Sequence, residues 1–382
     1  LPFSLSRLQQ ACSKQLGLSA KEVLTVAQAL YEKHKVSSYP RSDCPYLPES
    51  QHAEVPEVLQ AIMLNDPESA GMVNGASAEM KSRAFNDSKI SAHHAIIPTR
   101  GSADVSRMTE DERNVYRIIC RQFVAQFYAP HQFDRTHIIV ECGGQRFEAK
   151  GKTTRKAGWR VLFSGAAAEE KDDAKGEDEA EQQQLPAVKH GEPSVCRGAE
   201  VDSKTTRPPP HFTDATLIGA MENVARYTDD QKIKRVLAET AGLGTEATRS
   251  DTIEGAIQRG YLARDKTVIK STNKARAMIS MAPPAVTSPV MTGLWEQQLS
   301  AIANGQARRQ DFERQIIKWM SDVIHSIQGD ASAILQRSSG ALAPLVAPTH
   351  PCPVCQGTMV LRYSKPRAAT KTSPAREGGP FW

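Results

Sequence analysis

A short stretch at residues 37–49, SSYPRSDCPYLPE, contains a tyrosine and an arginine that together could react with a phosphodiester. Tyr39 precedes Pro40, which biases its backbone toward an extended conformation, and in an extended segment Tyr39 and Arg41 point to the same side. A phenol is a poor nucleophile at neutral pH unless positive charge stabilises the phenolate, and a guanidinium supplies this charge while also binding phosphate. The stretch therefore predicts a nucleophilic tyrosine; a packed aromatic beside a surface charge is the alternative for an isolated YPR tripeptide.

Two adjacent histidines, His93 and His94, lie in a second polar stretch at residues 86–100, NDSKISAHHAIIPTR. Neighbouring residues of an extended segment point to opposite sides, so one histidine can face a site while the other is structural. An imidazole beside a scissile phosphate could donate a hydrogen bond or pass a proton to the leaving oxygen. A surface pair, or a pair beside a metal, is the alternative.

A glycine-rich turn precedes a predicted helix at residues 242–262, GLGTEATRSDTIEGAIQRGYL. Its hydroxyls, Arg249 and the helix N-terminus suit contacts with phosphate. The turn lacks the lysine of a Walker loop, so it does not indicate binding of a nucleoside triphosphate. A capped core helix is the alternative.

Cys352 and Cys355 form a CxxC knuckle in CPVCQGTMVLR, which could give two thiolates to zinc. A structural zinc site needs four ligands, and no cysteine or histidine follows Cys355. The sequence therefore predicts half of a zinc site, and we expect the chain to be cut short after it.

The composition is that of a globular chain long enough for several domains, with 382 residues, 40% of them hydrophobic and 24% charged. The absence of a long apolar run predicts no membrane span, and seven mostly scattered cysteines favour the reducing cytoplasm. The net charge is +5, but residues 169–181 hold eight acids and two lysines, so the rest of the chain carries +11. Such an excess favours a polyanionic partner such as nucleic acid over the alternative of a merely basic soluble surface.

Periodicity predicts the elements that position these residues. A helix spans Leu5 to Cys12, a second begins at Ser19 with Glu22 in a capping box, and a third begins at Thr109 with Glu112. The inward face of the second helix is expected to contain Val23, Val26, Ala27, Leu30 and Tyr31, and that of the third Val115, Ile118, Ile119, Phe123 and Phe127.

The middle of the chain changes to short runs rich in strand-forming residues. Residues 136–142 and 145–150 flank a Gly143–Gly144 turn and predict a hairpin, and residues 159–163 (WRVLF) predict another strand. Residues 165–184 have no large apolar side chain and are expected to be a disordered insertion. Helices return after the three prolines that end at Pro210, and a linker is expected beyond Gly329.

Taken together, these motifs resemble those of type IA DNA topoisomerases, and most of all the bacterial topoisomerase III branch. The matching stretches, in chain order, are YPRSD with YLPE, SAHHAIIPT, GLGTEATRSDTI, TGLWEQQLSAIANG and CPVCQG. Enzymes of this family cut one DNA strand with a tyrosine, hold the 5′ phosphate covalently, pass another strand and reseal without ATP. The resemblance implies that Tyr39 is the nucleophile, Arg41 its phosphate-binding neighbour and His93 the active-site histidine, with Thr248 and Arg249 close to single-stranded DNA.

The resemblance also implies a mixed α and β, mainly helical, multidomain fold. Residues 1–124 would form the helical domain that carries the tyrosine, and residues 125–210 a β-rich arch segment with its acidic disordered insert near 165–190. Residues 211–328 would form the helical DNA-groove domain, and residues 329–382 the linker and a truncated zinc-ribbon-like tail.

Members of the family begin with a Toprim domain whose acidic residues hold magnesium, and no such motif precedes Leu1. We therefore expect a fragment that binds single-stranded DNA weakly and cleaves it inefficiently without its Toprim domain. The expected cofactors are Mg²⁺ through that domain and Zn²⁺ in a full-length tail. The expected substrates are single-stranded and negatively supercoiled or linked DNA, in the cytoplasm at the nucleoid and away from membranes.

Two other functions fit part of the pattern. A rolling-circle relaxase also pairs a tyrosine with histidines, but its metal-binding histidines are separated by one hydrophobic residue, whereas His93 and His94 are adjacent. A non-catalytic single-stranded DNA-binding module would need only the helix-turn-helix outline of the first two helices and the basic excess.

Overall fold

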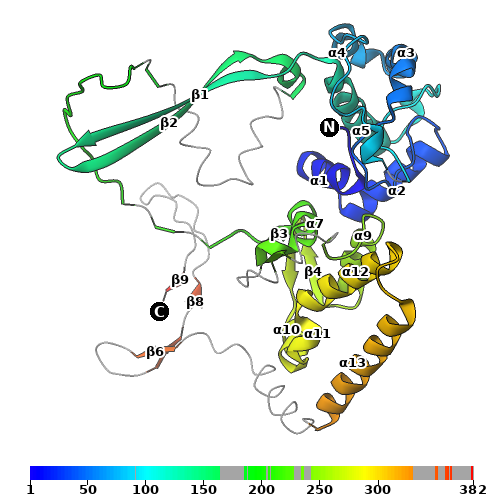
Figure 1. The fold of residues 1–382 in the computed structure, drawn as a ribbon, viewed down its shortest axis with the longest axis vertical. Helices are drawn as coiled ribbons and strands as arrows, with labels where there is room; N and C mark the ends of the chain where they lie inside the picture. The colour runs from blue at the N-terminus through cyan, green and yellow to red at the C-terminus, as the bar shows by residue number, and fades with distance from the viewer. Residues whose placement is uncertain are drawn as a thin grey trace, which may run out of the picture. The chain divides into compact units, whose positions relative to one another are not determined.

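A computed structural model describes most of the chain, and the arrangement of its elements is drawn in Figure 1. The described residues are 1–90, 92–163, 185–186, 188–203, 205–206, 208–227, 234–235, 242–329, 349–351, 358–360, 362–363 and 380–381. The acidic stretch predicted to be disordered, most of the predicted linker, and Cys352 and Cys355 lie outside these residues.

Contacts divide the chain into two compact units. The first comprises Leu1–Ile257 and Arg264–Lys270, and the second Gln258–Ala263 and Ser271–Trp382. All of the predicted site residues that the structure describes lie in the first unit. The division into four domains along the sequence stays a prediction.

The first unit contains most of the helices. They are α1 (Leu5–Leu16), α2 (Ala20–Glu32), α3 (Val55–Asn65), α4 (Ala70–Asn74), α5 (Glu110–Val124), α7 (Asp214–Glu222) and α9 (Arg249–Gln258, which ends one residue into the second unit). Short 3₁₀ turns connect them, at Glu49–Glu54, Pro67–Ser69, Asp87–Lys89, Val105–Arg107, Ala125–Phe127 and Val224–Tyr227.

Local sequence signals set the helix ends as predicted. The capping boxes of Ser19 with Glu22 and of Thr109 with Glu112 are both formed, so that each serine or threonine hydroxyl satisfies an amide of the first turn. Gly17 ends α1 in the left-handed conformation, with φ 71°. These contacts confirm the predicted starts of α2 and α5 and the break between the first two helices.

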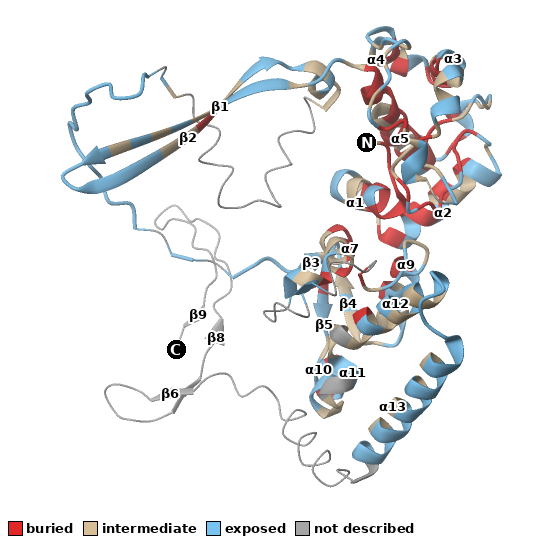
Figure 2. Cartoon of the chain, in the orientation of Figure 1, coloured by how far each residue is buried: buried red, intermediate tan, exposed pale blue. Residues whose placement is uncertain are grey.

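The hydrophobic core of the first unit lies among α1, α2, α3 and α5, where buried residues concentrate (Figure 2). All five residues predicted on the inward face of the third helix are buried, and the last of them, Phe127, lies in the 3₁₀ turn that follows α5. On α2 the prediction holds for Val23, Ala27 and Leu30, whereas Tyr31 is 37% exposed. The buried stripe of α2 therefore ends at Leu30, one residue earlier than predicted, and Tyr31 lies at the surface.

A long two-stranded hairpin follows α5 (Figure 1). β1 (Gln132–Cys142) pairs antiparallel with β2 (Gln145–Lys156) around Gly143 and Gly144, whose φ values are 59° and 77°. Two left-handed residues in a two-residue loop match the twist of the strands, which confirms the predicted hairpin.

The strand predicted at residues 159–163 is wrong, because Gly158–Phe163 is a 3₁₀ helix. Gly158 has φ 53°, and a Cβ on it would lie 2.3 Å from the carbonyl oxygen of Ala129. The amide of Trp159 donates to that same oxygen at 2.9 Å, and the Trp159 and Phe163 rings meet edge to face. A tertiary contact with the end of the α5 region therefore turns the chain where the local composition favours a strand.

β3 (Phe212–Thr213), β5 (Val268–Ser271) and β4 (Leu262–Asp265) form a sheet in that order. The second unit contains α10 (Asn273–Met281), α11 (Pro284–Thr287), α12 (Pro289–Ala303) and α13 (Arg309–Gly329), with short strands β6 (Thr349–Pro351), β7 (Thr358–Val360), β8 (Arg362–Tyr363) and β9 (Pro380–Phe381). Among the described residues, no helix has both the length and the apolar character needed to cross a bilayer.

An ion pair between the buried Asp66 and the partly exposed Arg117 joins α3 to α5. Asp66, at the end of α3, accepts two hydrogen bonds from Arg117, at 2.8 and 2.9 Å, and one from the Ser69 hydroxyl at 3.0 Å. Burial by itself would raise the pKa of the Asp66 carboxyl, but the hydrogen bonds from Arg117 and Ser69 outweigh it and lower the pKa below its ordinary value. The pair therefore stabilises the fold above about pH 4, the pKa region of an unfolded aspartate, and this contribution is lost as the pH falls through the lower folded pKa.

We predict that Asp66→Asn destabilises the first unit by about 2–3 kcal/mol at pH 7, because it removes the buried carboxylate that accepts two hydrogen bonds from Arg117 and leaves the guanidinium paired only with the exposed Glu68. The opening free energies of α3 and α5 from native-state hydrogen exchange would measure this loss. Thermal unfolding at pH 7 and pH 3 should also show a smaller acid sensitivity in the variant. The control is Asp104→Asn, which changes an exposed aspartate whose pKa is likewise lowered by hydrogen bonds, here from Ser106. Equal losses of stability in the two variants would contradict the stabilising role given to the Asp66–Arg117 pair.

Candidate active site around Tyr39

The candidate site is built where two segments distant in sequence lie side by side in the first unit. The segment that follows α2 pairs with residues 97–99: Ser38 N donates to Ile97 O at 2.9 Å, and Thr99 N donates to Val36 O at 3.0 Å. An antiparallel bridge joins Ser37 to Pro98 between these bonds. The pairing brings the YPR stretch against the histidine stretch.

The side chain of Ser38 reinforces this pairing from within. Its buried hydroxyl donates to Ala95 O and accepts from Ile97 N, both at 2.9 Å. On the far side, Ala95 N donates to Tyr46 O and Ile96 N donates to Phe3 O. The segment that directly follows the two histidines is therefore fixed by hydrogen bonds to Ser38 on one side and to Tyr46 and Phe3 on the other.

Tyr39 and His93 meet at the surface of this framework. Their ring centroids are 4.6 Å apart with an angle of 34° between the planes, and Tyr39 is 38% exposed. No hydrogen bond to the Tyr39 hydroxyl occurs within the described part of the chain. The phenol is thus open to a ligand and has an imidazole against its face.

His94 has different partners from its neighbour. Gln51 Nε2 donates to His94 Nε2 at 3.1 Å, and His94 Nδ1 donates to Ala95 O at 2.9 Å. With both ring nitrogens bonded to protein groups, His94 is structural, and the two histidines do not hold a common metal. This geometry disfavours the relaxase alternative.

Arg41, the second predicted site residue of the stretch, is half-buried and follows the buried Pro40. Within the described part of the chain it has no hydrogen bond or ion pair of its side chain. Its guanidinium is therefore not committed to a protein carboxylate, as a phosphate-binding arginine requires.

Tyr31 and Lys35 adjoin Tyr39 and were missed by the sequence analysis. The ring of Tyr31 meets Tyr39 edge to face at 5.8 Å, and Lys35 Nζ lies 5.7 Å from the centre of the Tyr31 ring. An open pocket of about 450 Å³, here called the Tyr39 pocket, is lined by Tyr31, Lys35, Ser37, Ser38, Tyr39, His94 and Thr99. No local sequence signal identifies them as neighbours of Tyr39, because α2 ends at Glu32 and helical spacing does not extend to Lys35 or Tyr39.

Thr248 and Arg249 lie apart from the Tyr39 pocket and differ in exposure. The Thr248 hydroxyl is exposed and accepts a hydrogen bond from Thr245 N at 2.9 Å. Arg249 is buried, and its Nη1 donates to the hydroxyl of Ser6 on α1 at 2.8 Å. A contact of Arg249 with DNA would require its guanidinium to leave this position.

Two glutamates complete the surroundings of Arg249. Nη1 lies 3.4 Å from Glu246 and 3.7 Å from Glu222, and Glu246 also accepts a hydrogen bond from the amide of Ser6 in the first turn of α1. Burial raises the pKa of the Glu246 carboxyl, and the hydrogen bonds from Ser6 and the charge of Arg249 only partly offset it. This cluster attaches the 243–249 turn to α1.

The described residues do not fit a resident magnesium or zinc ion. No group of three histidine, cysteine, aspartate or glutamate side chains comes together among them in a way that could hold a metal. The chemistry derived below therefore contains no step through a metal bound by these residues.

Comparison with known proteins identifies the family. The family model described as DNA topoisomerase matches residues 1–314, so the chain belongs to the DNA topoisomerase family. The match confirms the family predicted from the five motifs and the mixed, mainly helical fold.

Curated relatives give the same assignment. The chain is 41% identical over 330 residues to DNA topoisomerase 3 of Vibrio cholerae, covering 86% of this chain and 49% of that protein. It is 37% identical over 381 residues to DNA topoisomerase 3 of Salmonella typhimurium, covering 99% of this chain and 55% of that protein. The chain thus spans about half the length of the curated relatives it matches.

A solved structure supports the fold. Full-length topoisomerase I from Thermotoga maritima superposes with a TM-score of 0.54 at 18% identity, over 98% of this chain and 56% of that one. At this identity the match concerns the fold alone.

We predict that Ser38→Ala weakens the pairing of the two segments of the site, because it removes one hydrogen bond to Ala95 and leaves the buried amide of Ile97 without its acceptor. The expected cost is about 1–3 kcal/mol, read as faster hydrogen exchange at the Ile97 amide and a lower thermal midpoint.

Ser37→Ala is the matched control, since the Ser37 hydroxyl donates only to the adjacent carbonyl of Ser38. Its effect should be clearly smaller. If the two variants lose the same stability, Ser38 does not have the proposed part in joining the segments.

Proposed function

We propose that this chain carries the nucleophile of a type IA DNA topoisomerase, an enzyme that cuts one DNA strand and reseals it without ATP. The proposal rests on one observation, the contact of the exposed Tyr39 phenol with the ring of His93 at 4.6 Å. A tyrosine that only filled the core would be buried and would have no need of an imidazole at its face.

The proposed step is an in-line attack of the Tyr39 oxygen on a DNA phosphodiester. A bond forms between that oxygen and phosphorus, and the bond from phosphorus to the 3′ oxygen breaks, so the 5′ phosphate stays on the protein and the other strand end leaves as a 3′ hydroxyl. The phenol loses its proton and the 3′ oxygen gains one, and in this proposal His93 transfers the proton. Reversal of the same step reseals the strand, because the phosphotyrosine keeps the energy of the broken bond.

Arg41 binds the phosphate in this proposal. A guanidinium presents a fork of donors to the non-bridging oxygens and stabilises negative charge as it develops. The support for this role is the position of Arg41 two residues after Tyr39 and the absence, among the described residues, of a carboxylate paired with it.

The metal and the opposite half of the site belong to the Toprim domain that the family resemblance implies. Mg²⁺ held there would supply further charge neutralisation at the phosphate when bound. Passage of a second strand, relaxation of negative supercoils, separation of linked DNA molecules and action in the cytoplasm at the nucleoid are proposed for the whole protein.

Single-stranded DNA is the proposed substrate, and Thr248 and Arg249 the proposed residues of its path. The exposed Thr248 hydroxyl suits a direct contact with a phosphate. Arg249 would take part after release from Ser6, and until then it holds the turn that presents Thr248.

We predict that the 382-residue chain, given a fluorescent single-stranded oligonucleotide, magnesium and a separately supplied Toprim domain of a type IA enzyme, forms a covalent adduct visible on a denaturing gel. Tyr39→Phe should abolish the adduct while the dissociation constant for the oligonucleotide stays within about threefold, since only the nucleophilic oxygen is removed. Arg41→Ala should lower the adduct yield by about 10²-fold.

The matched control is Tyr227→Phe, which changes an exposed tyrosine outside the Tyr39 pocket and should keep the adduct. An adduct that persists in Tyr39→Phe would refute the nucleophile. An adduct that the chain forms without the Toprim domain, or in the presence of a chelator, would refute the proposed division of labour.

A further inference from the structure

Lys35 has a backbone conformation that lysine rarely adopts. It follows the C-terminal end of α2 with φ 58°, in the left-handed region, and the next amide, that of Val36, donates back to Leu30 O at 3.0 Å. This is the helix-ending position at which glycine is preferred, because a side chain with a Cβ makes the left-handed conformation unfavourable.

The fold requires this backbone conformation but not the lysine side chain. The carbonyl oxygen of Lys35 accepts from the Thr99 hydroxyl at 2.7 Å, and a Cβ on Gly101 would lie 2.2 Å from the same oxygen. These contacts involve only backbone atoms of Lys35, so glycine would satisfy them with less strain. A strained residue at the edge of a candidate site is a reason to look for a function of its side chain.

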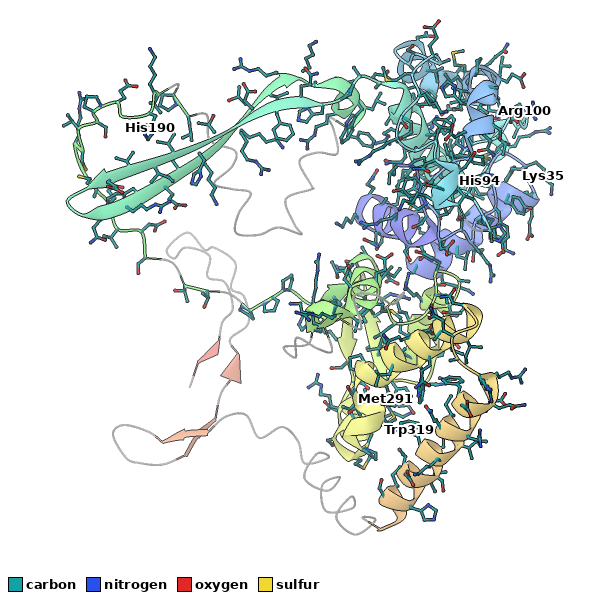
Figure 3. All side chains as sticks on the ribbon, in the orientation of Figure 1. Lys35, His94, Arg100, His190, Met291 and Trp319 are labelled. Atoms are coloured by element: carbon teal, nitrogen blue, oxygen red, sulfur yellow. The ribbon has the colours of Figure 1, made fainter. Side chains whose placement is uncertain are left out.

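The Lys35 side chain is exposed and lines the Tyr39 pocket together with Tyr31 and Tyr39. Figure 3 labels Lys35 and His94 in this part of the first unit. The Nζ of Lys35 lies 5.7 Å from the centre of the Tyr31 ring, and the Tyr31 ring in turn contacts the ring of Tyr39.

The ammonium of Lys35 differs in its pairing from nearby cations. Lys33 lies 3.7 Å from Glu112, and Arg100 lies 2.9 Å from Glu57. Lys35 itself has no carboxylate partner among the residues that the structure describes. The pocket that contains the Tyr39 phenol therefore has an uncompensated positive charge at its edge.

We propose that Lys35 binds a backbone phosphate of the DNA strand that enters the Tyr39 pocket, next to the phosphate that Tyr39 attacks. This inference rests on the proposed function, since the strand is the substrate proposed for the site. Tyr31, between the lysine and the nucleophile, provides an aromatic face for the intervening nucleotide. In this proposal a lysine stands at the strained left-handed position, where glycine would be less strained, because its positive charge is needed at the edge of the Tyr39 pocket.

Lys35→Gly provides a sharp test, because the substitution removes the charge and relieves the backbone strain at once. The expected result is a dissociation constant for a single-stranded oligonucleotide that rises on the order of fivefold at about 0.1 M salt, with the slope of log K against log salt reduced by about 0.7. The thermal midpoint should stay unchanged or rise, and Lys35→Arg should restore most of the affinity.

The matched control is Lys266→Gly, since Lys266 is the other described non-glycine residue with positive φ, at 55°, and does not line the Tyr39 pocket. It should keep the wild-type affinity and salt slope. Equal losses in both variants would mean a general effect of positive charge and would overturn the inference, as would a lower thermal midpoint in Lys35→Gly or unchanged binding.

Failure of this inference can be told apart from failure of the proposed function. The role of Lys35 is tested by the affinity for the oligonucleotide, whereas the proposed function is tested by formation of the covalent adduct. If wild type forms the adduct and Lys35→Gly binds normally, only the inference fails. If Lys35→Gly weakens binding and wild type with a Toprim domain forms no adduct, only the function fails. No measurable oligonucleotide binding by wild type in the presence of the Toprim domain would overturn the inference.

Discussion

The pairing of residues 36–38 with residues 97–99 is the constraint on which the candidate site depends. Its backbone hydrogen bonds and the Ser38 hydroxyl bring together two segments about sixty residues apart, so that the Tyr39 and His93 rings meet. Closing so long a loop costs conformational entropy, and the core beneath α2 and α5 offsets this cost. The geometry of the site therefore depends on the packing of the core, although the reacting groups of the site lie at the surface.

Charge is distributed unevenly over this framework. Arg117 and Arg249 are paired with carboxylates and join elements of the first unit. Lys35, which lines the Tyr39 pocket, and Arg41, two residues after Tyr39, have no such partner among the described residues. Paired arginines stabilise the fold, and unpaired cations leave a local positive potential that attracts a polyanion. Some of the basic residues thus stabilise the fold through ion pairs, and others give the surface a positive potential.

The sequence-based predictions succeeded where a local interaction decides the structure. Capping boxes and a two-glycine turn involve residues within three positions of one another, so the starts of α2 and α5 and the hairpin could be located without the fold. The strand predicted at residues 159–163 failed because a carbonyl of Ala129 captures the Trp159 amide. Tyr31 was assigned to the core because helical periodicity does not show where the apolar stripe ends.

The sequence by itself determined the family, the helical character and the residue types of the site, because short motifs carry the chemistry of a phenol, a guanidinium and an imidazole. Only the tertiary structure decided that the ring of His93 meets Tyr39 while His94 bonds to Gln51, that Arg249 is buried against Ser6, and that Lys35 lies at the pocket with a left-handed backbone. The physical reason is that hydrogen bonds between distant segments and burial depend on the closed core, whereas a residue's type and its neighbours in sequence do not.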